Sequence, residues 1–311
     1  MTVIERDRIG WRSWVWIGWR QHRAAILVTG GLITAIALFA LLSGPDRPFG
    51  FVMDIYIVWW KPYLPVALSA VIGAFWVAPL VAREFDNRTH LVSWTQDATP
   101  RQWLRANLVV LAVPAVALTV ALNVIERFMI SDLPVRGFTA ITFEANVFMA
   151  ITYTLFAIAL GVLFSALFRQ SVFAVAATLA TYVLVRILFA TSIRPHLLPP
   201  ARIATPWELP VRVFQDPPPD DVLWVGEGFL GDHGNEVTVP SGDMYECSLT
   251  SHTRELQAEC LSRTGIRGHY VDYQPLDRMA VLQFLEILVY LALTAGLVWL
   301  ALRRISRLKA L

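Results

Sequence analysis

Charged side chains are scarce in this sequence, and they are missing in blocks. Only 16% of the 311 residues are Asp, Glu, Lys or Arg, whereas 56% are hydrophobic; a soluble globular domain carries roughly 25% charged residues. Long uncharged segments of this kind are typical of chains that lie in lipid. The net charge is only +2, so the composition gives no electrostatic basis for binding nucleic acid.

Several signatures of catalysis and metal binding are also lacking. None of the six histidines forms a His-Glu-x-x-His motif, and there is no Gly-x-Ser-x-Gly nucleophile turn. His233, His252 and His269 lie near acidic residues and could bind a metal, but scattered solvated side chains explain them better. The phosphate-binding pattern Gly-x-x-x-x-Gly-Lys-Ser/Thr is absent. We therefore expect no metal, no catalytic residues and no cofactor bound by this chain.

Six apolar runs dominate what is present, and each can cross ~30 Å of hydrocarbon at 1.5 Å per residue. They are Ala24–Ser43, Tyr63–Ala82, Asn107–Ile125, Ala145–Phe168, Ser171–Ile193 and Met279–Leu302. The first run is too long for a signal-peptide core, and no small-residue cleavage site stands out after it. The predicted fold class is an all-α integral membrane protein, with transmembrane helices one to five in residues 24–193 and the sixth, followed by a basic tail, in 279–311.

Residues 1–23 combine tryptophan with arginine. On a helix, Trp11, Trp14 and Trp19 share one face, and Arg12 and Arg20 lie mostly away from it. Indole rings prefer the headgroup level of a bilayer. The pattern favours an amphipathic helix in the membrane interface over a cytosolic helical extension of the first span.

The distribution of positive charge sets the expected orientation. With the N-terminus inside, the cytoplasmic segments 1–23, 83–106, 169–170 and 303–311 hold fourteen Lys/Arg and five Asp/Glu. The external segments 44–62, 126–144 and 194–278 hold eleven Lys/Arg and eighteen Asp/Glu. Both termini are therefore predicted to be cytoplasmic.

The segment 194–278 separates the last two runs and is rich in proline, glycine and acidic residues. It cannot span a membrane, so we expect an extracytoplasmic domain or elaborated loop, with short strands near Val222–Val225 and Glu236–Val239. Cys247 and Cys260 both fall in it. An oxidising compartment would allow a disulfide there, worth about 3 kcal/mol; the alternative is two reduced buried thiols.

Two charges lie inside the apolar runs, Arg186 and Glu286. Arg186 lies ~22 Å from the cytoplasmic start of the fifth run, and Glu286 lies ~10 Å from the outer start of the sixth. With a ~30 Å core their depths agree to within a few Å. Each is costly alone in lipid, so we expect the two to pair near the outer mouth of the bundle, although Arg186 could instead snorkel outward.

The cytoplasmic segment 83–106 is the most distinctive part of the chain. The stretch GAFWVAPLVAREF (73–85), followed by RTHL (88–91), WTQ (94–96) and RQWL (101–104), resembles the matching region of actinobacterial type-2 permeases of ATP-binding cassette exporters. WRQHR (19–23), before the first span, is similar to the amphipathic entry of these permeases. Chemistry alone leaves an ordinary charged loop, anchored by interfacial tryptophans, equally open.

The resemblance implies a coupling helix at about Arg83–Trp94 that contacts a separate ATPase subunit. The coupling residues would be Arg83, Glu84, Phe85, Arg88, Thr89, Leu91 and Trp94. It further implies two ATPase copies carrying ATP and Mg, a second permease copy, and a bacterial plasma membrane location. The external segment departs from this family, whose members have short re-entrant helices there.

The expected function is ATP-driven export of an amphipathic or hydrophobic compound from the cell or the membrane. The competing hypothesis is a membrane-anchored sensor or assembly factor that binds a ligand or partner through the external domain. Such an anchor would not need the charged segment 83–106. An intramembrane enzyme is disfavoured, because neither Arg186 nor Glu286 has a visible nucleophile partner.

Overall fold

The structure is a computed structural model that describes residues 11–42, 64–86, 100–130, 137–168, 170–206, 222–238 and 265–308, with six further residues between 247 and 263. The chain divides into two compact units. A helical unit comprises Met1–Val135, Phe143–Leu188 and Phe284–Leu311, and a sheet unit comprises Arg136–Thr142 and Phe189–Gln283. Each is described below on its own.

Five helical segments in the described residues are long and apolar enough to cross a membrane. The α-helices that form them are α1 (Trp11–Leu42), α6 (Pro100–Ile130), α8 (Val147–Phe168), α9 (Ser171–Leu188) and α12 (Met279–Leu308). They coincide with five of the six predicted runs. Helix α1 continues without a break across position 23, so the proposed interfacial segment and the first span share one helix, on which Trp16 and Trp19 are exposed.

The second predicted run is folded as three consecutive segments. These are α3 (Leu64–Val71), a π-helical turn (Ile72–Val77) and α4 (Pro79–Asp86). The apolar part, Leu64–Val77, is shorter than a full span. The N–H of Ala78 donates to the carbonyl of Gly73 at 3.0 Å, the i→i+5 bond of a π-turn, and Pro79, which has no N–H, follows it. The uninterrupted helix expected over Tyr63–Ala82 is therefore not what these residues form.

The π-turn allows two backbones to come very close. A Cβ on Gly73 would lie 2.6 Å from the carbonyl oxygen of Ala157, and one on Gly161 would lie 2.5 Å from the carbonyl oxygen of Gly73. Only glycine fits at either position without a shift of the main chain. The π-turn is therefore pressed directly against the middle of α8.

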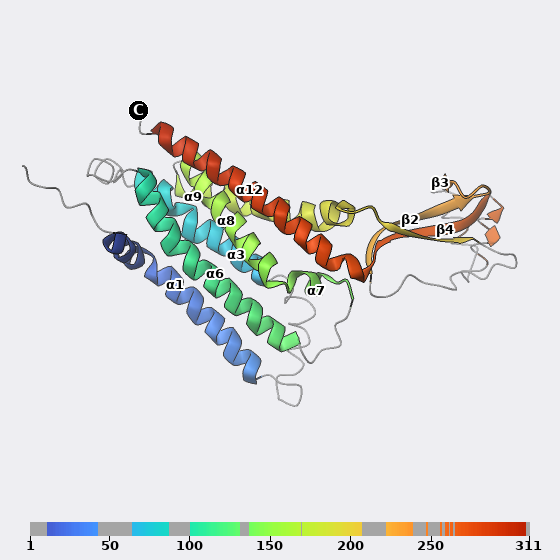
Figure 1. Ribbon diagram of the computed structural model, residues 1–311, viewed down its shortest axis with the longest axis horizontal. Coiled ribbons are helices and arrows are strands. Elements are labelled where there is room, and N and C mark those ends of the chain that lie inside the picture. Colours follow the sequence, from blue (N-terminus) through green and yellow to red (C-terminus); the bar gives the residue numbers. More distant parts are fainter. Residues whose placement is uncertain are drawn as a thin grey trace, which may run out of the picture. The chain divides into compact units, whose positions relative to one another are not determined.

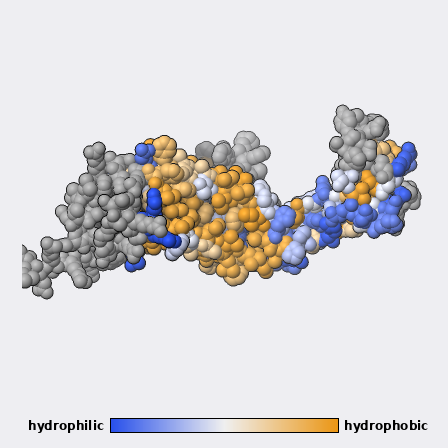
Figure 2. Space-filling view, turned by 90° about the horizontal axis from the view of Figure 1, so that it is seen from above, coloured by the Kyte–Doolittle hydropathy of each residue, from blue (hydrophilic) through white to orange (hydrophobic). Residues whose placement is uncertain are grey.

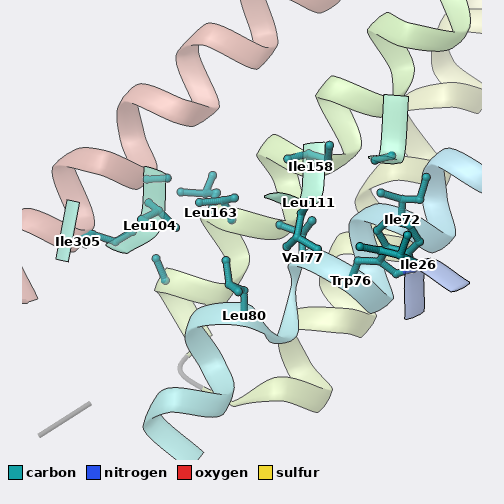
Figure 3. Close-up of a cluster of buried hydrophobic side chains, with 14 residues drawn as sticks. Ile26, Ile72, Trp76, Val77, Leu80, Leu104, Leu111, Ile158, Leu163 and Ile305 are labelled. Atoms are coloured by element: carbon teal, nitrogen blue, oxygen red, sulfur yellow. The ribbon is translucent and has the colours of Figure 1, made fainter. Parts of the chain in front are cut away.

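Apolar side chains from several helices fill the centre of the helical unit. Figure 3 shows Val77 of the π-turn beside Leu111 of α6, and Ile72 and Trp76 of the π-turn beside Ile26 of α1, all of them buried. Ile26 of α1 and Ile305 of α12 belong to the same cluster. Figure 1 shows α1 and α6 running side by side. On the face seen in Figure 2, the described residues of the helical unit are mostly hydrophobic, as expected for a surface that faces lipid.

The sheet unit is built on four antiparallel strands in the order β1-β4-β2-β3. The strands are β1 (Ala201–Pro206), β2 (Leu223–Gly231), β3 (Glu236–Val237) and β4 (Ile266–Gln274). Strands β2 and β3 occupy the two places where short strands were predicted, and β1 and β4 were not anticipated. Cys247 and Cys260 form a disulfide, the predicted pairing, and pack with Phe229 and Ile266.

Candidate functional site

The most unusual feature of the helical unit is a buried arginine. Arg186 lies near the end of α9, is only 8% exposed, and reaches carboxylates from two other helices. Its Nη2 donates to Oε1 of Glu144 at 2.7 Å, and its Nη1 donates to Oε1 of Glu286 at 3.1 Å. Glu144 ends the short helix α7 (Ala140–Glu144), and Glu286 lies on α12. One guanidinium thus connects three helices.

Two tyrosines complete this cluster. The guanidinium carbon of Arg186 lies 3.7 Å from the ring centroid of Tyr153 on α8, within range of a cation–π interaction. The hydroxyl of Tyr153 donates to Oε1 of Glu286 at 2.8 Å, and the hydroxyl of Tyr290 on α12 accepts from Nη1 of Arg186 at 3.3 Å. The two rings meet edge to face, 5.1 Å apart. Arg186, Glu144, Glu286, Tyr153 and Tyr290 are called the arginine cluster below.

The arginine cluster stabilises the packing of its helices only while all of its charged partners stay in place. Charges taken out of water are stabilised only while their partners stay in place, and removing one partner leaves an uncompensated charge. Arg186 lies on α9, Tyr153 on α8, and Glu286 and Tyr290 on α12, so any separation of these helices would expose the charges to lipid or require water to enter. Separating these helices is therefore costly unless water or new partners reach the charges.

Sequence reasoning predicted one contact of this cluster and missed the others. Arg186 and Glu286 were expected to pair from their depths alone, and the structure places their side chains 3.1 Å apart. Glu144 directly precedes the fourth apolar run and was counted with the external segment 126–144. Its position at the start of a span was the available signal. Tyr153 and Tyr290 carry no charge, so a search for charges inside the runs could not find them.

The predicted coupling residues are described only in part. Arg83, Glu84 and Phe85 lie in the last turns of α4, and the side chain of Arg83 is exposed. Arg88, Thr89, Leu91 and Trp94 lie outside the described residues. Helix α4 packs against α8 and α9, so a displacement of α4 would reach the helix that carries Arg186. Within the described residues no group of three or more His, Cys, Asp or Glu could hold a metal ion.

Several long apolar helices around a buried ionic cluster define a multi-pass helical membrane protein. Residues 54–194 match the family described as "ABC-2 membrane transporter related". This match covers α3 to α9, including Glu144, Tyr153 and Arg186, and it supports an ABC-2 type permease family. No curated protein and no solved structure matches the chain.

Proposed function

We propose that this chain is the membrane-spanning permease subunit of an ATP-driven exporter of the ABC-2 type. It would move an amphipathic or hydrophobic compound out of the cell or out of the membrane. The observation that carries the proposal is the family match over residues 54–194, which falls on the part of the helical unit that contains α4 and most of the arginine cluster.

The proposed complex contains this permease, a second permease copy, and two copies of a separate cytoplasmic ATPase that binds ATP and Mg. The exporter would lie in a bacterial plasma membrane with both termini inside and the sheet unit outside. The disulfide Cys247–Cys260 supports an oxidising surrounding for the sheet unit. The exposed apolar side chains along α9, such as Phe173 and Leu184, fit contact with lipid.

We further propose separate roles for α4 and for the arginine cluster during transport. The ATPase would press on the segment that begins with Arg83–Phe85 in α4, and α4 would transmit the displacement to α8 and α9, against which it packs. The arginine cluster would hold α8, α9 and α12 together until that displacement separates them. It would act as a latch at the outer end of the pathway.

The decisive experiment measures coupling in the assembled exporter. The chain should co-purify with an ATPase that has a phosphate-binding loop, and the chain alone should hydrolyse no ATP. Glu84→Ala combined with Phe85→Ala should leave the complex intact but lower the amount of compound transported per ATP hydrolysed at least tenfold. Arg304→Ala changes an exposed arginine near the end of α12 and should leave transport unchanged.

Two results would count against this assignment. Unchanged transport in the double variant at normal expression would remove the coupling role from α4. A chain that never associates with an ATPase would favour the membrane-anchored sensor instead, with the sheet unit as its binding part.

A further inference from the structure

Three hydroxyl side chains form a buried ladder inside the helical unit. The Oγ of Ser69 on α3 lies 2.9 Å from Oγ1 of Thr154 on α8, which lies 3.1 Å from Oγ1 of Thr119 on α6. Ser69, Thr119 and Thr154 are each 0% exposed. The ladder joins three helices with groups that carry no charge.

The ladder has more acceptors than donors. Each hydroxyl also lies 2.9 Å from a carbonyl oxygen one turn back in its own helix, that of Pro65, Ala115 or Ala150. Three hydroxyl hydrogens are therefore shared among five contacts, three to carbonyls and two between hydroxyls. A hydroxyl has one donor and two lone pairs. The ladder can therefore accept a further N–H or O–H donor without losing its links to the backbone.

One turn farther along α6 from Thr119 lies Asn123, on the same face of the helix and ~6 Å away along its axis. Its side chain is 0% exposed. Within the part of the chain that the structure describes, neither its Oδ1 nor its Nδ2 has a hydrogen-bond partner. An amide without partners in an apolar interior is costly, and folded proteins rarely leave such a group without a hydrogen-bond partner.

We propose that Asn123 and the ladder form a hydrogen-bonding subsite for the uncharged polar group of the transported compound, which rests on the export function proposed above. The compound class is an amphipath whose head is an amide or hydroxyl, because such a head both donates to the ladder and pairs with the amide of Asn123. The subsite lies on α3, α6 and α8 and is separate in its residues from the charged latch.

The proposal makes an unusual prediction for stability. Replacing a residue that only supports the fold lowers the stability of the protein. Replacing a buried polar group that is kept for binding should instead raise the stability of the ligand-free protein. Asn123→Leu, which is close in volume, should therefore raise the thermal unfolding midpoint of the full chain in nanodiscs. Asn123→Ala provides a second variant in case leucine overpacks the site.

The binding test uses a matched pair of neutral probes, N-dodecylacetamide and its ester analogue dodecyl acetate, which lacks the N–H donor. The amide should raise the unfolding midpoint of the wild-type chain more than the ester does. Asn123→Leu and Asn123→Ala should each weaken the apparent affinity for the amide about tenfold and remove this preference, as expected for the loss of one hydrogen bond. Thr178→Val is the control, because Thr178 is equally buried but donates to a carbonyl of its own helix, that of Ala174.

Each outcome supports or overturns the subsite. No preference for the amide in the wild-type chain would overturn it, and so would an amide response within twofold of wild type in both variants. Lowered midpoints with unchanged binding would assign Asn123 to the fold, for example through a structural water. ATPase stimulation by N-dodecylacetamide in the assembled complex tests the export function separately. Binding of the amide at the subsite without stimulation of the ATPase would support the subsite and count against the export function.

Discussion

The two units of this protein each contain the same arrangement of side chains in opposite surroundings. In the helical unit Arg186 pairs with Glu144 and Glu286 and lies 3.7 Å from the ring centroid of Tyr153. In the sheet unit Arg202 pairs with Asp272 and Glu236 and lies 3.9 Å from the ring centroid of Tyr270. The first arginine side chain is 9% exposed and the second 40%.

The difference in exposure decides what each arrangement can do. Around Arg202, two bonds of 2.7 Å to Asp272 form a bidentate pair, and these bonds raise the pKa of Arg202 above its ordinary value. Water can replace either partner there, so the net energy is small. Around Arg186 water is excluded, so the same contacts are hard to replace. Similar groups of side chains thus give a water-exposed ion pair in the sheet unit and a buried one in the helical unit.

The largest predicted effect comes from breaking the buried arrangement on one side only. Arg186→Ala should lower the free energy of unfolding by about 3–5 kcal/mol, because two buried carboxylates lose their partner. Unfolding in mixed micelles measures this change. Replacing all three charges, with Arg186→Met, Glu144→Gln and Glu286→Gln, should restore most of the stability.

The triple variant also separates the latch from the fold. If the cluster is a latch, the complex assembled with a stable triple variant should show raised ATPase activity without substrate, because separating the helices no longer exposes charge. A triple variant as unstable as Arg186→Ala, with normal basal ATPase activity, would contradict the latch. A double-mutant cycle between Arg186→Ala and Glu286→Ala should give a coupling energy above ~0.5 kcal/mol.

The next largest effect is predicted for the disulfide between Cys247 and Cys260 in the sheet unit. Replacing Cys247 and Cys260 with alanine should cost it about 3 kcal/mol, since the disulfide closes a short loop next to Phe229 and Ile266. Hydrogen exchange of β4 amides in the intact chain measures the loss. The helical unit serves as internal control, and equal loss of protection in α8 would show that the two units do not unfold separately.

The two arginines also differ in how far the sequence could predict them. Arg186 and Glu286 stand out because charge is rare inside apolar runs, and helix geometry converts their positions into depths. Arg202 and Asp272 are opposite each other only because β1 pairs with β4 in one register, 70 positions apart in the sequence. No local pattern fixes such a pairing. The break in the second span was missed for a related reason, since the π-turn depends on contact between Gly73 and α8.

A smaller effect should follow from pH in the sheet unit. Burial lowers the pKa of His269 on β4 below its ordinary value of 6.5, although Glu227 opposes the shift. The unfolded chain therefore takes up a proton more readily, so the stability of the sheet unit should fall as pH decreases below about 6.5. Hydrogen exchange of β1 and β4 amides at pH 7.5 and 5.5 measures this. His269→Phe should flatten the dependence, and an unchanged slope would mean that other groups cause it.

The smallest effect is predicted for the exposed counterpart of the latch. Arg202→Ala should destabilise the sheet unit by about 0.2–1 kcal/mol, because water takes over the contacts to Asp272 and Glu236. What remains should shrink further in 1 M salt, where charges are screened within ~3 Å. Arg202→Lys keeps the charge but loses the bidentate fork, so it separates geometry from charge. A loss as large as that of Arg186→Ala, and independent of salt, would show that the exposed face of the sheet is covered in the assembled protein, because only exclusion of water gives an ion pair of this geometry such weight.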